Sequence, residues 1–426
     1  MNQDGSPRSV PSNYVHVLEN DPRTKGVIRL NELDGRKYIT ADLGWKRKIT
    51  DPLDDNDLNH IRLMLQQDYG LFNIKEVEAA VDMMAHKNSF HPIRDLLNSL
   101  VWDGTPRIDN LLHHFLGAEK SPFNSACIRL WMLGAISRVF DPGCKFDYVL
   151  CLIGDQGAGK STFFRKMAIR DEWFSDDMKR LDDPMVYRQI SGHWILELPE
   201  MSAMYNTRYV EDVKALLSRR ADTYKIPYAR FPKDFLRQCV FGGTGNRIEF
   251  LPMDRSGNRR FLPILIDSKK AETHILTDEA ASEEYILQCW AEAMVLYRAG
   301  DFKLMLPKEI EDQLRDIQQL FTPEDDESGV IIGFLERTEK RAVCSRMIFT
   351  EAFHDDRQPT KAQLRSIAEA TAHVINEGLV EGWEKAPNKI DFGDPYGRQR
   401  AWVRIPSDPS TEEFKTVQLP LGVFDD

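Results

Sequence analysis

The sequence has few cysteines, and they are not arranged for metal or disulfide chemistry. Its 426 residues include six cysteines, and no two form a C-x-x-C pair. This excludes a zinc ribbon and gives no sign of a disulfide framework. No apolar run approaches the length of a membrane span, and the opening residues MNQDGSPRSVPSNY lack the apolar centre of a signal peptide. We therefore expect a protein of a reducing cytoplasm with no membrane partner.

Positive charge is also scarce over the chain as a whole. The net charge of −11 argues against a surface that is basic all over, so contact with nucleic acid would need a local patch. Residues 213–237 form such a patch, in which basic and aromatic residues alternate on a predicted hairpin. Its residues Lys225, Arg230 and Lys233 are the predicted contacts to a single strand, whose bases would stack on the aromatic rings. A solvated charged loop over core aromatics remains the alternative.

The strongest motif lies in residues 146–162, FDYVLCLIGDQGAGKST. A short apolar run is followed by a full match to G-x-x-x-x-G-K-[ST], which predicts a buried strand, a phosphate-binding loop and the first turn of a helix. Lys160 can reach the β- and γ-phosphates of a nucleoside triphosphate, and the Ser161 hydroxyl can ligate Mg²⁺. The predicted ATP-binding residues are Gly154, Asp155, Gln156, Gly157, Ala158, Gly159, Lys160, Ser161 and Thr162. The competing interpretation is a glycine-rich turn without a ligand.

Two glutamates follow a second apolar run, HWILELPEM, which spans residues 193–201. A phosphate loop needs a neighbouring strand whose terminal carboxylate holds Mg²⁺, directly or through water, and a second carboxylate that polarises the attacking water. Glu197 and Glu200 are the predicted pair, with Glu197 as the metal ligand. Which glutamate plays which role stays open, and an acidic residue at a strand end is common.

Two further segments carry candidate catalytic residues. Residues 238–246 predict another buried strand that ends at Asn246, whose amide could contact the γ-phosphate or the lytic water. An asparagine that merely suits a turn is the alternative. Arg259 and Arg260 precede the run FLPILI, and an arginine can stabilise charge on the transferred phosphoryl group, also from a neighbouring subunit. By composition alone, surface arginines before a strand are the simpler interpretation.

The C-terminal part predicts a winged helix. A helix around residues 347–353 precedes a second helix that starts at Thr360 with Gln363 in capping-box spacing, and strand-like runs at 379–383 and 401–405 flank a polar loop. Its charge is mixed, so duplex DNA binding and protein docking both stay open.

We expect an α/β protein with a P-loop NTPase core, an α-rich N-terminal region and a C-terminal helical and winged-helix domain. The predicted divisions are a flexible tail (1–24), an N-terminal α+β region (25–115), the ATPase core (116–270), a helical segment (271–325), the winged-helix-like domain (326–408) and an acidic tail (409–426).

With these segments placed, the chain resembles the virulence-associated E family of phage, prophage and mobile-island proteins. These are P-loop ATPases related to the superfamily III, primase-associated helicases. The matching stretches are HPIRDLLNSLVWDGTPRIDNLL, PGCKFDYVLCLIGDQGAGKSTFFRKMA, WILELPEMSAM, VKALLSRRADTYKIPYAR, FGGTGN and GNRRFLPI. The likeness is dense over residues 90–300, and the order of the motifs makes it specific.

The resemblance implies an AAA+-like core, with Glu197 and Glu200 as the acidic pair, Asn246 as the sensor and Arg259 or Arg260 as the finger. It further implies a ring, often hexameric, with residues 225–233 lining the pore on single-stranded DNA, in the cytoplasm of a bacterial host. Residues 1–90 carry no primase or polymerase motif, so a priming partner would be a separate protein or an absent domain.

Three hypotheses about function follow. The first is an oligomeric, Mg²⁺-dependent ATPase that translocates on DNA and unwinds it during replication of a phage or mobile element. The second is a nucleotide-gated switch that recruits a partner without unwinding. The third is a DNA-binding initiator in which ATP has only a structural role.

Overall fold

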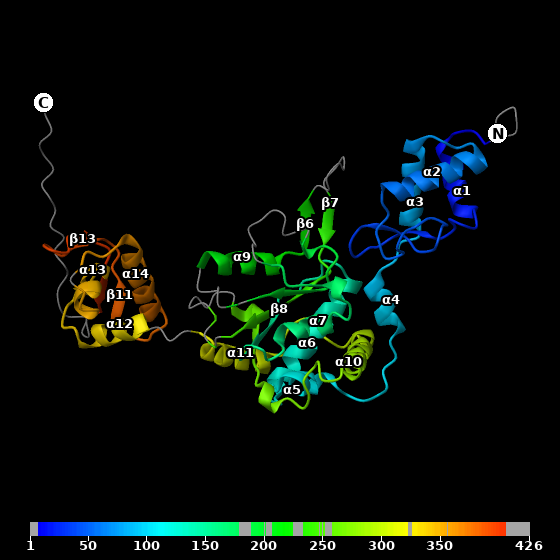
Figure 1. Cartoon of the computed structure of the whole chain (residues 1–426). Coiled ribbons are helices and arrows are strands. Elements are labelled where there is room, and N and C mark those ends of the chain that lie inside the picture. The colour runs from blue at the N-terminus through cyan, green and yellow to red at the C-terminus, as the bar shows by residue number, and fades with distance from the viewer. Residues whose placement is uncertain are drawn as a thin grey trace, which may run out of the picture. The chain divides into compact units, whose positions relative to one another are not determined.

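The computed structural model describes residues 7–178, 189–199, 201, 207–224, 233–246, 248, 250–251, 258–322, 326–355 and 357–405. The chain divides into two compact units, Met1–Pro323 and Glu324–Asp426, and each is described by itself (Figure 1). The acidic tail predicted over 409–426 lies outside the described residues.

A five-stranded parallel sheet forms the centre of the first unit. In spatial order its strands are β4 (Phe174–Ser175), β5 (Ile195–Leu198), β8 (Val240–Gly245), β3 (Val149–Ile153) and β9 (Phe261–Leu265). Leu150 and Leu152 belong to one core cluster, whereas Val149 and Ile153 belong to another. Because alternate side chains of a strand point to opposite faces, the sheet is covered on both sides. The α/β class predicted from the sequence is confirmed.

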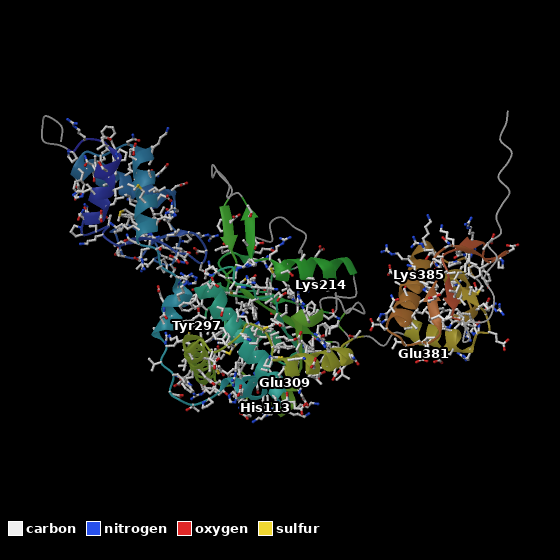
Figure 2. All side chains as sticks on the ribbon, turned by 180° about the vertical axis from the view of Figure 1, so that it is seen from behind. His113, Lys214, Tyr297, Glu309, Glu381 and Lys385 are labelled. Atoms are coloured by element: carbon white, nitrogen blue, oxygen red, sulfur yellow. The ribbon has the colours of Figure 1, made fainter. Side chains whose placement is uncertain are left out.

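Helices cover the two faces of this sheet (Figures 1 and 2). The cluster around Leu150 includes side chains from α6 (Pro122–Phe140), α7 (Lys160–Met167) and α10 (Glu279–Ala299), and the cluster around Val149 includes side chains from α9 (Thr207–Ser218). Buried indole N–H groups need acceptors, and three tryptophans find them on backbone carbonyls of other elements. These bonds run from Trp131 to Phe241 (2.8 Å), from Trp194 to Ala135 (3.1 Å) and from Trp290 to Met167 (3.0 Å).

Shorter elements complete the core of this unit. They are α4 (Pro92–Ser99), η1 (Ile108–Asn110), α5 (Leu111–Leu116), η2 (Asp171–Trp173), β6 (Ala221–Tyr224), β7 (Lys233–Leu236), η4 (Asn258–Arg260), η5 (Ser268–Lys270) and α11 (Lys308–Leu320). Strands β6 and β7 pair antiparallel, which confirms the predicted hairpin, and they project from the body of the sheet (Figure 1).

The N-terminal region has its own apolar cluster. It contains α1 (Pro11–Asn20), β1 (Ile28–Leu30), β2 (Lys37–Ile39), α2 (Asp55–Tyr69) and α3 (Ile74–Lys87). The flexible tail predicted over residues 1–24 is wrong for α1, because Tyr14 and Leu18 are fully buried one helical turn apart. The polar and Pro/Ser-rich surroundings of these two side chains concealed the short apolar face.

The second unit is a small α/β body. Its helices are α12 (Asp326–Arg337), α13 (Ser345–Met347), the turn η6 (Ile348–Ala352) and α14 (Lys361–Asn376), and its strands are β10 (Ala342–Val343), β11 (Trp383–Lys385), β12 (Ile390–Asp391), β13 (Arg398–Gln399) and β14 (Trp402–Arg404). The capping box of Thr360 and Gln363 is confirmed at the start of α14. The strand predicted over 379–383 is displaced to β11, because Gly382 takes a left-handed turn conformation with φ of 80°.

Candidate functional site

The glycine-rich loop joins the carboxyl end of β3 to the first residue of α7. In open parallel sheets, ligands bind beyond the carboxyl ends of the strands. Gly157 and Gly159 have φ of 81° and 82°, a region that residues with a Cβ rarely adopt. A Cβ on Gly154 would lie 2.7 Å from the carbonyl oxygen of Ile266, so this position also requires glycine. Glycine is therefore favoured at each of these three positions by the backbone conformation or by the space available.

Lys160 reaches back over this loop. Its Nζ donates to the carbonyl oxygens of Gly154 and Asp155, each at 2.7 Å, and to Oδ1 of Asn246 at 2.9 Å. Burial lowers the pKa of the Lys160 ammonium, against the opposing attraction of nearby carboxylates. The residue that follows β8 is thus brought to the loop.

Glu197 lies beside the start of α7. Its Oε1 accepts hydrogen bonds from Ser161 Oγ at 2.7 Å and from Thr244 Oγ1 at 2.6 Å. The side chain is 2% exposed, and its Oε2 has no hydrogen-bond partner among the described residues. Burial raises the pKa of the Glu197 carboxyl, while the two hydroxyl donors act in the opposite direction.

This arrangement fits a magnesium ion. A buried carboxylate oxygen without a partner and a hydroxyl beside it are oxygen ligands, which Mg²⁺ prefers. No group of three or more His, Cys, Asp or Glu side chains suited to a metal occurs in the described part of the chain. A metal held at Glu197 and Ser161 would therefore complete its shell with water and substrate phosphates, as Mg²⁺ usually does.

Thr244 is a site residue that the sequence did not single out. It lies 47 residues from Glu197 and is brought there because β5 and β8 are adjacent parallel strands. A hydroxyl in the last buried positions of a strand, two residues before Asn246, is the one signal that points to it.

The two arginines do not reach this loop. Arg259 and Arg260 precede β9, and β9 is parallel to β3 with Phe261 opposite Val149. They therefore lie at the amino edge of the sheet, separated from the loop by the length of a five-residue strand, roughly 16 Å. Arg260 is half-buried, with Nε 3.3 Å from Asp147 Oδ2 and Nη2 donating to Ser218 Oγ at 3.0 Å. Arg259 is exposed.

The hairpin is held firmly at its base. The Arg237 guanidinium is buried and makes two bonds to Asp222, at 2.8 and 3.0 Å, and a third to the carbonyl of Leu216 in α9. This fork-shaped ion pair ties β6 and the segment after β7 to the helix. The predicted contacts Lys225 and Arg230 lie outside the described residues, as does Glu200, and Lys233 is described only as the first position of β7.

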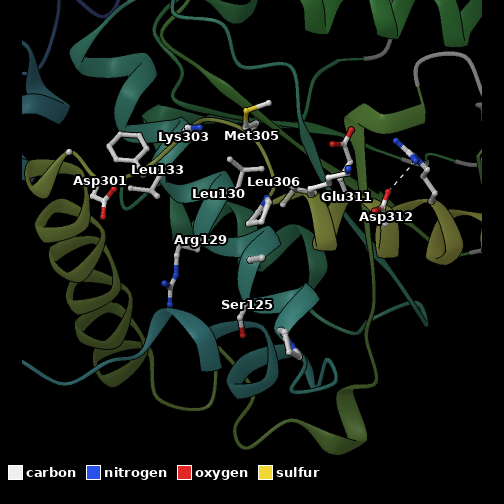
Figure 3. Close-up of a pocket in the computed structure, with 17 residues that line it drawn as sticks. Ser125, Arg129, Leu130, Leu133, Asp301, Lys303, Met305, Leu306, Glu311 and Asp312 are labelled. Atoms are coloured by element: carbon white, nitrogen blue, oxygen red, sulfur yellow. Dashed lines mark hydrogen bonds and ion pairs between the residues drawn. The ribbon is translucent and has the colours of Figure 1, made fainter.

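The predicted site residues do not line the pocket shown in Figure 3. This pocket has a volume of about 1120 Å³ and is lined by α6 and residues 300–315. Leu130, Leu133 and Leu306 contribute apolar walls, and charged side chains such as Arg129 and Glu311 also line it. The candidate site is therefore the loop edge of the sheet and not this pocket.

Comparisons with known proteins found one matching family model and similar solved structures. The family model for the virulence-associated protein E-like domain matches residues 97–323, more than half of the chain. A solved structure titled the A form apo structure of the NrS-1 C-terminal region has a TM-score of 0.50 and 14% identity, over 91% of this chain and 98% of that one. A second structure of that region has a TM-score of 0.47 and 13% identity, over 93% and 99%.

No curated protein matches the chain. None of the helices in the described ranges is long and apolar enough to cross a membrane. The family match covers the sheet, the glycine-rich loop and the hairpin together. The chain belongs to the virulence-associated protein E-like domain family.

Proposed function

We propose that the first unit is a P-loop NTPase core and that the protein is a Mg²⁺-dependent ATPase. The observation that carries this proposal is the convergence of three strand ends on one loop. Lys160 bonds to Asn246 from β8, and Ser161 bonds to Glu197 from β5. A hydroxyl, a buried carboxylate and an amide therefore lie around one glycine-rich turn, and these are groups that can serve a nucleoside triphosphate and its Mg²⁺.

Each residue then has a distinct task. The backbone N–H groups of the loop and the start of α7 cradle the phosphates, and Lys160 exchanges its bonds to loop carbonyls for bonds to phosphate oxygens. Ser161 and Glu197 would hold Mg²⁺, and the bound ion would supply positive charge close to the phosphates. Asn246 orients the γ-phosphate or the attacking water, and Glu200 polarises that water.

The arginine that stabilises the transition state comes from a neighbouring subunit in this proposal. The support is the position of Arg259 at the sheet edge opposite to its own loop. Arg260 is engaged with Asp147, so the exposed Arg259 is the better finger. The proposed assembly repeats this contact head to tail, and such interfaces form a ring, such as a hexamer, when the rotation between subunits closes.

Hydrolysis is coupled to movement on single-stranded DNA, in replication of a phage or mobile genetic element. The support is the anchored hairpin, the basic residues Lys225, Arg230 and Lys233 in its sequence, and membership of the family. Priming would be supplied by a separate protein or by a domain absent from this sequence.

A second candidate function is a nucleotide-gated switch or DNA-binding initiator. The observation that favours it is the second unit, which has its own apolar cluster and a capped helix, α14, beside a three-stranded antiparallel sheet. We propose that this unit is a winged helix that binds a partner or duplex DNA.

ATP hydrolysis measured with and without single-stranded DNA tests the proposal. Wild-type protein should hydrolyse ATP with Mg²⁺, faster with DNA, and Lys160→Ala should hydrolyse none. Lys145→Ala, at an exposed lysine before β3, is the matched control and should retain activity. Hydrolysis that survives Lys160→Ala would refute the ATPase assignment. A strand-displacement assay separates a helicase from a switch, which would bind ATP and assemble without displacing a strand.

A further inference from the structure

The segment between β9 and α10 passes directly beside the glycine-rich loop. Ile266 packs against Gly154, and Thr273 N donates to the carbonyl of His114 at 3.1 Å. Ile275 is 1% exposed, so the segment is fixed on both sides of His274. The position of His274 is therefore set by the fold and not by its own side chain.

His274 itself lies against the loop. Its Nε2 is 3.6 Å from the place where a Cβ on Gly159 would be. One carbon–carbon bond is about 1.5 Å, so Nε2 lies within about 5 Å of the Gly159 Cα. Gly159 is the residue immediately before α7. Backbone N–H groups at the start of a helix can bind an anion.

The hydrogen bonding of the ring fixes which nitrogen can donate. Nδ1 of His274 accepts from the backbone N–H of Leu276 at 3.2 Å. In the neutral ring the proton must then reside on Nε2. The imidazole is exposed, and Nε2 has no hydrogen-bond partner among the residues that the structure describes.

We propose that His274 binds the phosphate chain of the nucleotide by donating a hydrogen bond from Nε2–H. This rests on the proposed function of the loop and adds a contact that its motif does not contain. A phosphate cradled at residues 157–161 would lie close to Gly159, and the absence of a Cβ there leaves the space between the loop and the imidazole open. The His274 segment follows β9 by a long connection, so the contact joins a second part of the chain to the nucleotide.

Equilibrium binding of ADP tests the proposal with two variants. His274→Ala removes both ring nitrogens. His274→Asn keeps an acceptor for the N–H of Leu276, because asparagine readily forms this two-residue turn. The asparagine side chain is too short to replace Nε2. Both variants should bind Mg²⁺–ADP about tenfold more weakly than wild type, as expected for the loss of one hydrogen bond to a charged group. Adenosine, measured by competition against a fluorescent ADP analogue, should bind the variants as it binds wild type.

The outcomes distinguish a failure of the His274 contact from a failure of the proposed function of the loop. If wild-type protein binds no ADP, the proposed function of the loop fails. If wild type binds ADP and His274→Asn binds it equally well, His274 serves only the turn and the inference is overturned. Equal losses for adenosine and ADP would place the ring on the base or sugar, which also overturns it. Unchanged thermal unfolding of both variants without ligand shows that the fold is intact.

Discussion

Glu197→Gln should stabilise the ligand-free protein while weakening its response to magnesium. At neutral pH the Glu197 side chain is 2% exposed, and its Oε2 has no partner among the described residues. Glutamine has the same shape and is neutral, and its carbonyl oxygen can still accept from Ser161 and Thr244. The substitution removes a buried charge without breaking the two hydrogen bonds.

The size of the effect follows from the oxygen without a partner. A buried polar group left without a hydrogen bond costs about 1–3 kcal/mol, and more if it is charged. The glutamine amide keeps part of that cost, so we expect the free energy of unfolding to rise by about 1–2 kcal/mol. For a unit of this size the melting temperature should rise by about 2–4 °C.

The pH dependence has a defined sign. Burial raises the pKa of Glu197 above its ordinary value near 4.5. The folded state then binds the proton more tightly, so this group favours folding at low pH and that contribution is lost as pH rises through the raised pKa. The gain from Glu197→Gln should be absent near pH 4.5 and should grow toward neutral pH.

Thermal unfolding is measured from pH 4.5 to 8 in chelator and again with Mg²⁺–ADP. Wild type should gain stability from Mg²⁺–ADP, and the variant should gain less, because it lacks the anionic oxygen ligand. Glu292→Gln is the matched control. Its buried carboxylate accepts from the backbone N–H groups of Arg107 and Ile108, so the variant should lose about 1 kcal/mol. A ligand-free Glu197→Gln protein that melts below wild type at pH 7.5, or an undiminished magnesium response, would refute the reasoning.

Three further predictions concern other parts of the chain. Arg259→Ala should abolish ATP hydrolysis but retain ATP binding, and mixing it with Lys160→Ala protein should restore some turnover; no restoration would argue for a role within one subunit. Gly242→Ala should lower the free energy of unfolding by about 1–3 kcal/mol, because its Cβ would lie 2.4 Å from the buried Phe164 ring. Gly329→Ala, at an open position on α12, should raise it by about 0.5–1 kcal/mol. Equal effects of the two substitutions on thermal unfolding would contradict the packing. Leu18→Ala should lower the free energy of unfolding by about 2–5 kcal/mol. An unchanged melting temperature would contradict the packing of α1 and favour a loose tail.

Features encoded in short stretches of sequence could be predicted. The strand before the glycine-rich loop is apolar at every position because both faces of the sheet are covered, and the loop glycines occur where φ is positive or a Cβ would collide. Thr360 and Gln363 predict the start of a helix from four consecutive residues. In each case the physical cause acts within one element.

Features that depend on contacts between distant elements could not be predicted from the sequence. Thr244 meets Glu197 only through the register of β5 on β8, and His274 reaches Gly159 only because the segment after β9 folds back over the loop. The edge occupied by Arg259 is an intermediate case. Once β3 and β9 are taken as parallel, a residue before β9 must lie opposite to a loop after β3. That deduction needs the sheet order, which no local pattern contains.

The opposite positions of Arg259 and the glycine-rich loop have a kinetic consequence under the proposed mechanism. A single chain then contains both halves of the catalytic apparatus but cannot use them together. Specific activity should fall on dilution, because turnover depends on encounters between chains. An isolated chain would bind ATP without hydrolysing it. Hydrolysis would begin only where chains assemble, for instance along a shared DNA strand.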